Sequence, residues 1–225
     1  MPGRLAKSLL LDFNQLLSMK QLYFVRHGQT EWNAIRRMQG QSNSDLTELG
    51  RQQAQTNGQF LADVSIDYLV ASPLDRTRQT AAIINRYLQL DIKYDIRIME
   101  WDCGDWSGEL WDQLDKKWPD EFNAWRSDPF NFRGPKCENY PDMIDRVTPF
   151  LQELLARPET NIAIVSHGVI GRVMVGCLLD MNADEMLSFS QNNDAIMQLS
   201  GFANYNYCHF IGGKGPIAGL PPRSI

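Results

Sequence analysis

Two short apolar runs, residues 22–25 and 162–165, each end close to a histidine that is followed by glycine. The first run continues into Arg26-His27-Gly28 and the second into Ser166-His167-Gly168. Apolar runs of this length are typical of strands buried in a sheet. Open α/β sheets bind their ligands at the carboxyl ends of their strands. Because the chain has only three histidines, two at strand ends predict that both imidazoles face one site.

Strands and helices are expected to alternate along most of the chain. Further strand-like runs lie at 67–71, 91–94, 195–199 and 205–211, and helical patterns at 47–62, 74–88, 143–156 and 169–179. Thr47 is a plausible N-cap for the first of these helices. The alternation predicts an α/β fold, a three-layer sandwich with a mainly parallel central sheet and helices on both faces. The alternative is an α+β protein with a segregated sheet.

Residues 99–140 differ from the rest of the chain, since they hold five of its six tryptophans together with several prolines. This stretch predicts short helices and loops that form a small Trp-rich cap over the sheet. At 225 residues, the chain fits a single domain. We expect that domain to span 21–211, with the cap inserted at about 99–140. An extension, 1–20, precedes it, and a loose tail rich in glycine and proline, 212–225, follows it.

Net charge, cysteine spacing and the length of apolar runs argue against several classes of partner. The net charge of −5 argues against nucleic acid as a general partner. The four cysteines form no C-x-x-C pair and have no metal-like spacing, which is typical of free thiols in a reducing cytosol. No apolar run reaches the roughly 18 residues of a membrane span. We therefore expect a cytoplasmic protein with no membrane or nucleic-acid partner, and leave a homodimer open.

Four groups of residues suggest the chemistry. An arginine fork such as that of Arg26 suits phosphate oxygens, and a neutral imidazole such as that of His27 can attack phosphorus. Gly28 is expected to let the backbone pass close to the ligand. Arg76 follows Ser72-Pro73 and lies in a first helical turn, where anions are favoured. Glu100 is a candidate general acid, and His167 could hydrogen-bond phosphate oxygens.

Each of these residues alone would more often be structural or solvated, but together they suit phosphoryl transfer. That reaction depends mostly on positioning and on charge neutralisation. No metal is required if arginines and imidazoles supply the positive charge.

The order and approximate spacing of these motifs resemble the histidine phosphatase superfamily, and within it the phosphoglycerate-mutase-like branch. The resemblance extends from about residue 22 to about residue 210. It rests on Arg26-His27-Gly28-Gln29-Thr30 with Trp32-Asn33, Gln39-Gly40, Leu46-Thr47-Glu48-Leu49-Gly50, Ser72-Pro73-Leu74 with Arg76, Glu100, and Ser166-His167-Gly168.

The resemblance implies that His27 is the nucleophile and carries a transient phosphohistidine. It implies that Glu100 protonates the leaving oxygen and later activates water. The residues it implies for binding the phosphoryl group or the substrate are Arg26, Asn33, Gln39, Gly40, Arg76, His167 and Gly168. Neither a metal nor another cofactor is expected.

The sequence favours a phosphomonoesterase that acts on a small phosphorylated metabolite. Cofactor-dependent glycolytic mutases of this family typically follow the catalytic glutamate with Arg-His-Tyr-Gly, whereas Glu100 is followed by Trp101-Asp102-Cys103-Gly104. A phosphoglycerate mutase that uses 2,3-bisphosphoglycerate and an inactive phospho-ligand binding protein are the alternatives. The tryptophans of the cap could form an apolar wall around an organic leaving group, or they could simply form the core of a small lid. A second anionic group could bind to four cations that are otherwise surface charges: Arg36, Arg37, Arg133 and Lys136.

Overall fold

A computed structural model describes residues 19–201 and 206–223 of the chain. Almost all of the expected N-terminal extension, 1–20, therefore lies outside the described residues. The core is a seven-stranded sheet in the order β3-β2-β4-β1-β5-β6-β7. Its strands are β1 (Gln21–Arg26), β2 (Tyr68–Ala71), β3 (Ile92–Tyr94), β4 (Asn161–Ser166), β5 (Ala195–Ser200), β6 (Asn206–Ile211) and β7 (Lys214–Ala218).

The sheet is mixed. Strands β1 to β4 run parallel to one another, whereas β5, β6 and β7 add antiparallel neighbours beyond β1. In the central pair, Val25 of β1 lies opposite Val165 of β4, and Arg26 lies opposite Ser166. This register brings the carboxyl ends of β1 and β4 side by side, so the segments that follow them start at the same edge of the sheet.

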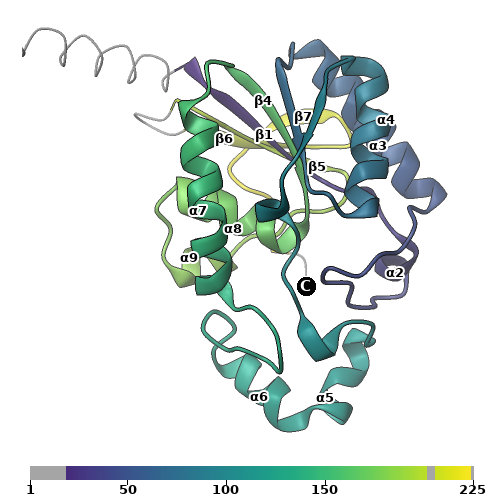
Figure 1. Cartoon of the computed structure of the whole chain (residues 1–225), viewed down its shortest axis with the longest axis vertical. Helices are drawn as coiled ribbons and strands as arrows, with labels where there is room; N and C mark the ends of the chain where they lie inside the picture. The colour runs from purple at the N-terminus through teal and green to yellow at the C-terminus, as the bar shows by residue number, and fades with distance from the viewer. Residues whose placement is uncertain (1–18, 202–205, 224–225) are drawn as a thin grey trace, which may run out of the picture.

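Helices cover both faces of the sheet, so the expected three-layer α/β fold is confirmed (Figure 1). Alternate residues of β1 separate the two layers. Leu22 and Phe24 pack with α7 (Tyr140–Ala156) and α8 (Gly168–Leu178), whereas Tyr23 and Val25 pack with α3 (Glu48–Asp63) and α4 (Asp75–Leu88). This separation follows from the twofold alternation of side chains along a strand. The helices are α2 (Glu31–Ala34), α3 (Glu48–Asp63), α4 (Asp75–Leu88), α5 (Leu114–Lys117), α6 (Pro119–Ser127), α7 (Tyr140–Ala156), α8 (Gly168–Leu178) and α9 (Ala183–Leu187).

Helix termini follow the capping signals in the sequence. The Thr47 hydroxyl accepts a hydrogen bond from the Gly50 amide, as expected of the N-cap of α3. Asn139 forms a reciprocal capping box with Asp142 at the start of α7. Within the part of the chain that the structure describes, no helix has the length and apolarity needed to cross a membrane.

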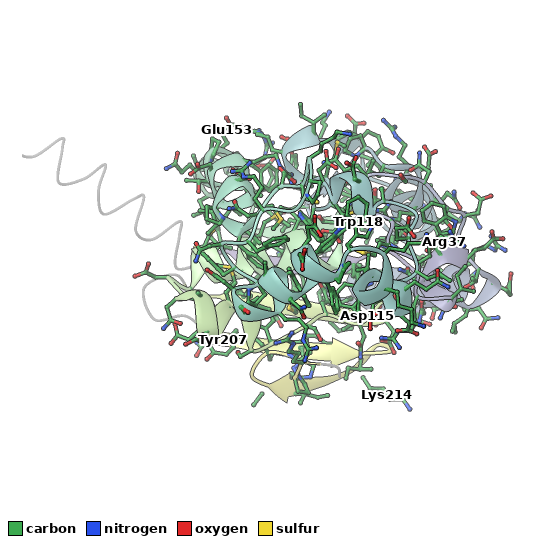
Figure 2. The ribbon with its side chains drawn as sticks, turned by 90° about the horizontal axis from the view of Figure 1, so that it is seen from below. Arg37, Asp115, Trp118, Glu153, Tyr207 and Lys214 are labelled. Carbon is green, nitrogen blue, oxygen red and sulfur yellow. The ribbon has the colours of Figure 1, made fainter. Side chains whose placement is uncertain are left out.

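The Trp-rich stretch forms a small cap of short helices below the sheet in Figure 1. Besides α5 and α6, it contains two 3₁₀ turns, η2 (Gly104–Trp106) and η3 (Trp111–Gln113), and a third, η1 (Ile96–Ile98), precedes it. Figure 2 looks onto this cap, with Asp115 and Trp118 in front of the sheet. Trp106 is completely buried and stacks on Phe132, with ring centroids 5.8 Å apart. Part of the tryptophan content therefore builds the core of the cap.

The segment after Gly212 was expected to be loose, but the structure shows a strand there. β7 pairs antiparallel with β6, and Lys214 marks this hairpin in Figure 2. Gly212 and Gly213 form the turn with positive φ values of 56° and 71°, a conformation that suits a tight hairpin. Every residue of β7 is exposed, so the strand lacks the apolar alternation by which strands are recognised in a sequence.

Candidate active site

Both strand-end histidines lie at the carboxyl edge of the parallel half of the sheet. His27 follows β1 and His167 follows β4, and their ring centroids are 5.2 Å apart in an edge-on arrangement. Their side chains are buried, with 2% of His27 and none of His167 exposed. The structure therefore brings the two imidazoles together, as the sequence predicts.

The His27 ring is held in one neutral tautomer. Its Nδ1 lies 2.8 Å from the carbonyl oxygen of Gly28, which can only accept, so Nδ1 carries the proton. Its Nε2 is then an acceptor for Nε of Arg76, at 3.2 Å. Burial, together with the positive charges of Arg76 and Arg26, lowers the pKa of His27 well below its ordinary value. The ring is neutral near pH 7, with the Nε2 lone pair directed toward a guanidinium group.

Arg76 is fixed by main-chain carbonyl groups. Its Nη1 donates to the oxygen of Ser42 at 2.7 Å and its Nη2 to the oxygen of Gly40 at 2.6 Å. The residue lies in the first turn of α4 and is 1% exposed. Burial lowers the pKa of Arg76 to about 10, so the side chain stays cationic at neutral pH. Gly40 has a φ of +49°, and a Cβ there would lie 2.4 Å from Sγ of Cys103.

Arg26 is buried beside the start of α8. Its Nη1 donates to the carbonyl oxygen of Gln191 at 2.7 Å, while its buried Nε has no hydrogen-bond partner among the described residues. A Cβ on Gly168 would lie 3.2 Å from Cζ of Arg26, so the glycine leaves room for the guanidinium group. Burial lowers the pKa of Arg26, and the nearby carboxylate of Glu100 opposes that effect.

His167 is the N-cap residue of α8, and its ring packs edge-on against that of His27. Its Nε2 is 2.8 Å from the hydroxyl oxygen of Ser72. Its Nδ1 is buried, and no described residue hydrogen-bonds it. Burial and the charge of Arg76 lower the pKa of His167 well below its ordinary value, so this ring too is neutral. Neither His167 nor Gly168 is among the residues that line the cavity described below.

Glu100 reaches the N-terminus of α8. Its Oε1 accepts hydrogen bonds from the amides of Trp101 at 2.9 Å and Ile170 at 3.0 Å, and its Oε2 accepts from Val169 at 3.2 Å. Free amides at the start of a helix favour a negative charge. Main-chain donors therefore set the direction of this carboxylate beside the two buried arginines.

These residues surround a cavity of about 280 Å³. Seven of the nine residues that the sequence assigns to the site line it: Arg26, His27, Asn33, Gln39, Gly40, Arg76 and Glu100. Asn33 and Gln39 both hydrogen-bond to Thr30, the N-cap residue of α2, and these bonds fix the two side chains in the cavity wall. The other residues that line the cavity are Arg37, Met38, Trp101, Cys103, Trp111 and Val169. The arrangement can bind an oxyanion between two guanidinium groups and present a neutral imidazole to it.

Of the four cations that could bind a second anionic group, only Arg37 reaches this cavity. Arg36 pairs with Asp112, Arg133 with Asp142, and Lys136 with Asp105. Over residues 19–201 and 206–223, no group of three or more histidine, cysteine, aspartate or glutamate side chains could hold a metal ion.

Two supporting residues had no signal in the sequence. Gln191 accepts from Arg26 through its carbonyl oxygen, and its buried amide donates to the carbonyl oxygens of Phe24 and Ala195. The amide of Asn193 donates to the carbonyl oxygen of His27 at 2.7 Å. Both lie in the loop between α9 and β5, where polar residues are ordinary, so only the structure reveals their contact with the site.

Comparison with known proteins agrees with this geometry. The family model of the histidine phosphatase superfamily (branch 1) matches residues 22–210. The chain belongs to this superfamily, and the resemblance inferred from its motifs is confirmed. It is therefore an enzyme of a superfamily whose members similar to it include phosphatases and mutases.

Relatives of both kinds are similar in sequence. Phosphoserine phosphatase 1 of Hydrogenobacter thermophilus is 35% identical over 176 residues, which cover 78% of this chain and 83% of that protein. A probable phosphoglycerate mutase GpmB of Erwinia tasmaniensis is 39% identical over 171 residues, 74% of this chain and 78% of that protein. Among solved structures, a mycobacterial glucosyl-3-phosphoglycerate phosphatase in complex with VO3 has a TM-score of 0.75 at 31% identity, covering 85% of this chain and 98% of that one.

Proposed function

We propose that this chain is a metal-independent phosphomonoesterase that hydrolyses a small phosphorylated metabolite through a phosphohistidine on His27. The observation that carries the proposal is the neutral tautomer of His27, with Nε2 free of a proton and directed toward the guanidinium of Arg76. A phosphoryl group bound by Arg76 would meet this lone pair. The mycobacterial glucosyl-3-phosphoglycerate phosphatase solved in complex with VO3 supports an oxyanion site in this fold.

In the first step, Nε2 of His27 forms a bond to phosphorus as the bond to the leaving oxygen breaks. The guanidinium groups of Arg26 and Arg76 neutralise the oxygens of the transferring group. His167 does not line the cavity, so we assign it to support of the His27 ring, against which it packs edge-on. Glu100 gives a proton to the leaving oxygen. The Gly28 carbonyl oxygen keeps the Nδ1 proton and so stabilises the positive charge on the phosphorylated ring.

In the second step, water attacks phosphorus and gives a proton to the carboxylate of Glu100, and the bond between nitrogen and phosphorus breaks. The products are an alcohol and inorganic phosphate, and the enzyme returns to its starting state. Asn33 and Gln39 contact the substrate from the cavity wall. Gly40 and Gly168 serve the site indirectly, because the carbonyl of Gly40 holds Arg76 and Gly168 makes room for Arg26.

A phosphoglycerate mutase is the second candidate, and the GpmB relatives favour it. The same phosphohistidine would then pass its phosphoryl group to a hydroxyl group of phosphoglycerate instead of water. An inactive phospho-ligand binding protein is the third. The three candidates differ in what happens after an oxyanion binds.

The test incubates the full chain with a panel of phosphomonoesters in excess EDTA. We expect phosphate release that falls at least about 10³-fold in His27→Ala, because loss of a nucleophile removes the covalent path. His209→Asn, which changes the third histidine in β6, is the matched control and should stay active. Quenched wild-type enzyme should carry an acid-labile, base-stable phosphate that His27→Ala lacks.

Full activity in His27→Ala would overturn the proposal. Conversion of 3-phosphoglycerate to its 2-isomer after priming with 2,3-bisphosphoglycerate, without phosphate release, would assign the mutase. Binding of esters without either reaction would assign the binding protein.

A further inference from the structure

A second cavity continues the first beneath the cap. It too encloses about 280 Å³, and it shares three lining residues, Trp101, Trp111 and Val169, with the cavity that holds His27. The remaining wall is mostly apolar and includes Trp125, Pro129, Phe132, Tyr140 and Met143. The leaving group of an ester bound at His27 can therefore extend along the shared apolar residues into the second cavity.

The walls of this second cavity are flat and braced by one another. Trp111 meets Trp125 edge-on, with ring centroids 5.2 Å apart, and Phe122 stacks on Trp125 at 5.5 Å. Another wall residue, Tyr140, stacks on Phe130 with ring centroids 5.1 Å apart. The indole Nε1 of Trp101 donates to the carbonyl oxygen of Glu138 at 2.6 Å. Rings held in this way offer faces and edges to a planar guest without losing side-chain freedom.

Arg172 lines the second cavity and has no counter-charge among the residues that the structure describes. Arg172 projects from α8, and its Nη1 donates to the hydroxyl oxygen of Tyr140 at 2.8 Å. Its buried Nε has no hydrogen-bond partner among the described residues, and no ion pair formed by those residues includes it. An unpaired buried donor on a guanidinium group is costly unless a ligand oxygen meets it.

The carboxylate in the same cavity does not neutralise Arg172. Both oxygens of Glu138 accept hydrogen bonds from Arg146, each at 2.8 Å, and one of them also accepts from the amide of Asp102. Exposed Arg223 adds a further cation to the lining. The second cavity therefore combines aromatic walls with a net positive charge, and its charge lies close enough to the first cavity that Arg172 lowers the pKa of buried Arg26.

We propose that the second cavity is the leaving-group subsite, and that it selects phosphate monoesters whose leaving group joins a flat apolar body to an oxyanion bound by Arg172. This inference rests on the phosphatase proposed above. The rings would stack on the flat body, and the arginine fork would pair with the oxyanion, which is represented below by a carboxylate. A three-carbon acid such as the serine of phosphoserine leaves the ring-lined space unfilled and should be a poorer substrate.

The experiment compares six esters: phenyl phosphate, phosphoserine, 4- and 3-carboxyphenyl phosphate, and their uncharged analogues 4- and 3-carbamoylphenyl phosphate. KM and kcat are measured for the wild type, Arg172→Gln and Arg126→Gln. Arg126 is an exposed arginine of α6 that lines neither cavity, so it controls for loss of a cap-region charge. The 3-carboxyphenyl and 3-carbamoylphenyl isomers are included so that the position of the charged group does not decide the result.

For the wild type, we expect a KM at least about tenfold lower for the better carboxyphenyl isomer than for its carbamoyl analogue, as a charged hydrogen bond can supply. Arg172→Gln should raise that KM about tenfold while leaving phenyl phosphate within about twofold. Arg126→Gln should resemble the wild type. Trp125→Leu, which keeps the wall apolar but removes the ring, should raise KM for all aryl esters and leave phosphoserine unchanged.

Equal effects of Arg172→Gln on phenyl and carboxyphenyl phosphate would assign Arg172 a structural role and overturn the inference, while His27-dependent hydrolysis would keep the phosphatase assignment intact. A higher kcat/KM for phosphoserine than for every aryl ester would overturn the substrate class.

If no ester is hydrolysed, the phosphatase assignment fails. Quenching of tryptophan fluorescence by 4-carboxyphenyl phosphate in His27→Ala, with and without Arg172→Gln, then decides the subsite: weaker binding in the double variant supports it, and equal binding overturns it.

Discussion

The reactivity proposed for His27 depends on neighbours that act in separate ways. The Gly28 carbonyl oxygen fixes the proton on Nδ1, and Arg76 lies at Nε2, where a phosphoryl group would bind. Burial and the two arginines lower the pKa of the ring, which keeps the lone pair available. A buried histidine is usually a structural residue, but one that is held neutral between two guanidinium groups suits attack on an anion.

The proton that we assign to Glu100 can be tested through the leaving group. We predict that Glu100→Gln lowers kcat for phosphoserine by about 10²- to 10⁴-fold, because its alkoxide leaves poorly without general acid help. The loss should be much smaller for 4-nitrophenyl phosphate, whose leaving group needs little protonation. Steady-state kinetics with both esters measure the difference, and Glu48→Gln, an exposed carboxylate of α3, is the control. An equal loss for both esters would mean that Glu100 only positions its neighbours.

The neutral state of His167 should appear in the dependence of stability on pH. Its pKa is lowered by folding, so below pH 6.5 the unfolded chain binds a proton that the folded chain does not. Stability is therefore full above about pH 6.5 and falls as the pH decreases toward the folded pKa. We predict that His167→Asn makes the loss between pH 6.5 and 5.5 shallower by up to about 1.4 kcal/mol per pH unit. Urea unfolding at pH 7.5, 6.5 and 5.5 measures it, and identical slopes would contradict the prediction.

At the scale of elements, two glycines join the loop after β1 to the start of α3. A Cβ on Gly28 would lie 2.1 Å from the carbonyl oxygen of Gly50, and one on Gly50 would lie 2.0 Å from that of Gln29. From the sequence, Gly28 is expected to let the backbone pass close to the ligand. The structure shows that Gly28 also lets two backbones meet, and that contact places His27 relative to α3.

We predict that Gly28→Ala destabilises the fold by about 3 kcal/mol or more, because neither backbone can yield as a side chain would. Gly171→Ala in α8 should change stability by less than about 1 kcal/mol, since its nearest neighbour is the side-chain oxygen of Gln191 at 3.1 Å and alanine favours the helix. Chemical unfolding of both variants provides the comparison. A mild effect of Gly28→Ala would show that the loop can move away from α3.

Strands with a strong hydrophobic pattern could be predicted from the sequence, and strands that lack such a pattern could not. The buried strands β1 and β4 are recognisable because both of their faces are covered, so they read as apolar runs. β7 was not predicted, because an exposed outer strand that contains Gly215 and Pro216 carries no such pattern. The antiparallel half of the sheet was not anticipated either, since pairing direction depends on tertiary contacts.

The location of the first cavity could be predicted because its residues follow strand ends or open helices. Arg26, His27 and Arg76 lie at such positions, and the sequence also marks Glu100 as a candidate general acid. Arg172 could not be found in this way, since it is one polar residue inside an otherwise apolar helix. Its unpaired guanidinium is visible only when the cap and α8 are placed together.

At the scale of the molecule, the site lies where four parts of the chain meet: the loop after β1, the start of α4, the cap and the start of α8. Each part contributes a lining residue, namely His27, Arg76, Trp111 and Val169. An anion that binds there contacts both Arg26, at the end of β1, and Arg76, in the first turn of α4. It therefore links a strand of the sheet to a helix that covers it. Ligand binding should therefore stabilise the whole molecule, which provides a test that needs no turnover.

We predict that orthovanadate or inorganic phosphate at ten times its Kd raises the free energy of unfolding by about 1.4 kcal/mol, since it binds only the folded chain. For a chain of this size, the shift in Tm should be about 3–6 °C. Chloride at matched ionic strength should have no such effect, and EDTA should leave the shift unchanged, because no metal is invoked. Each variant is compared with and without ligand, so that its own stability cancels: Arg76→Gln should lose the shift, whereas Arg126→Gln should keep it. A shift that survives in Arg76→Gln would place the anion outside the cavity of His27, and a shift abolished by EDTA would require a metal that the proposed mechanism does not use.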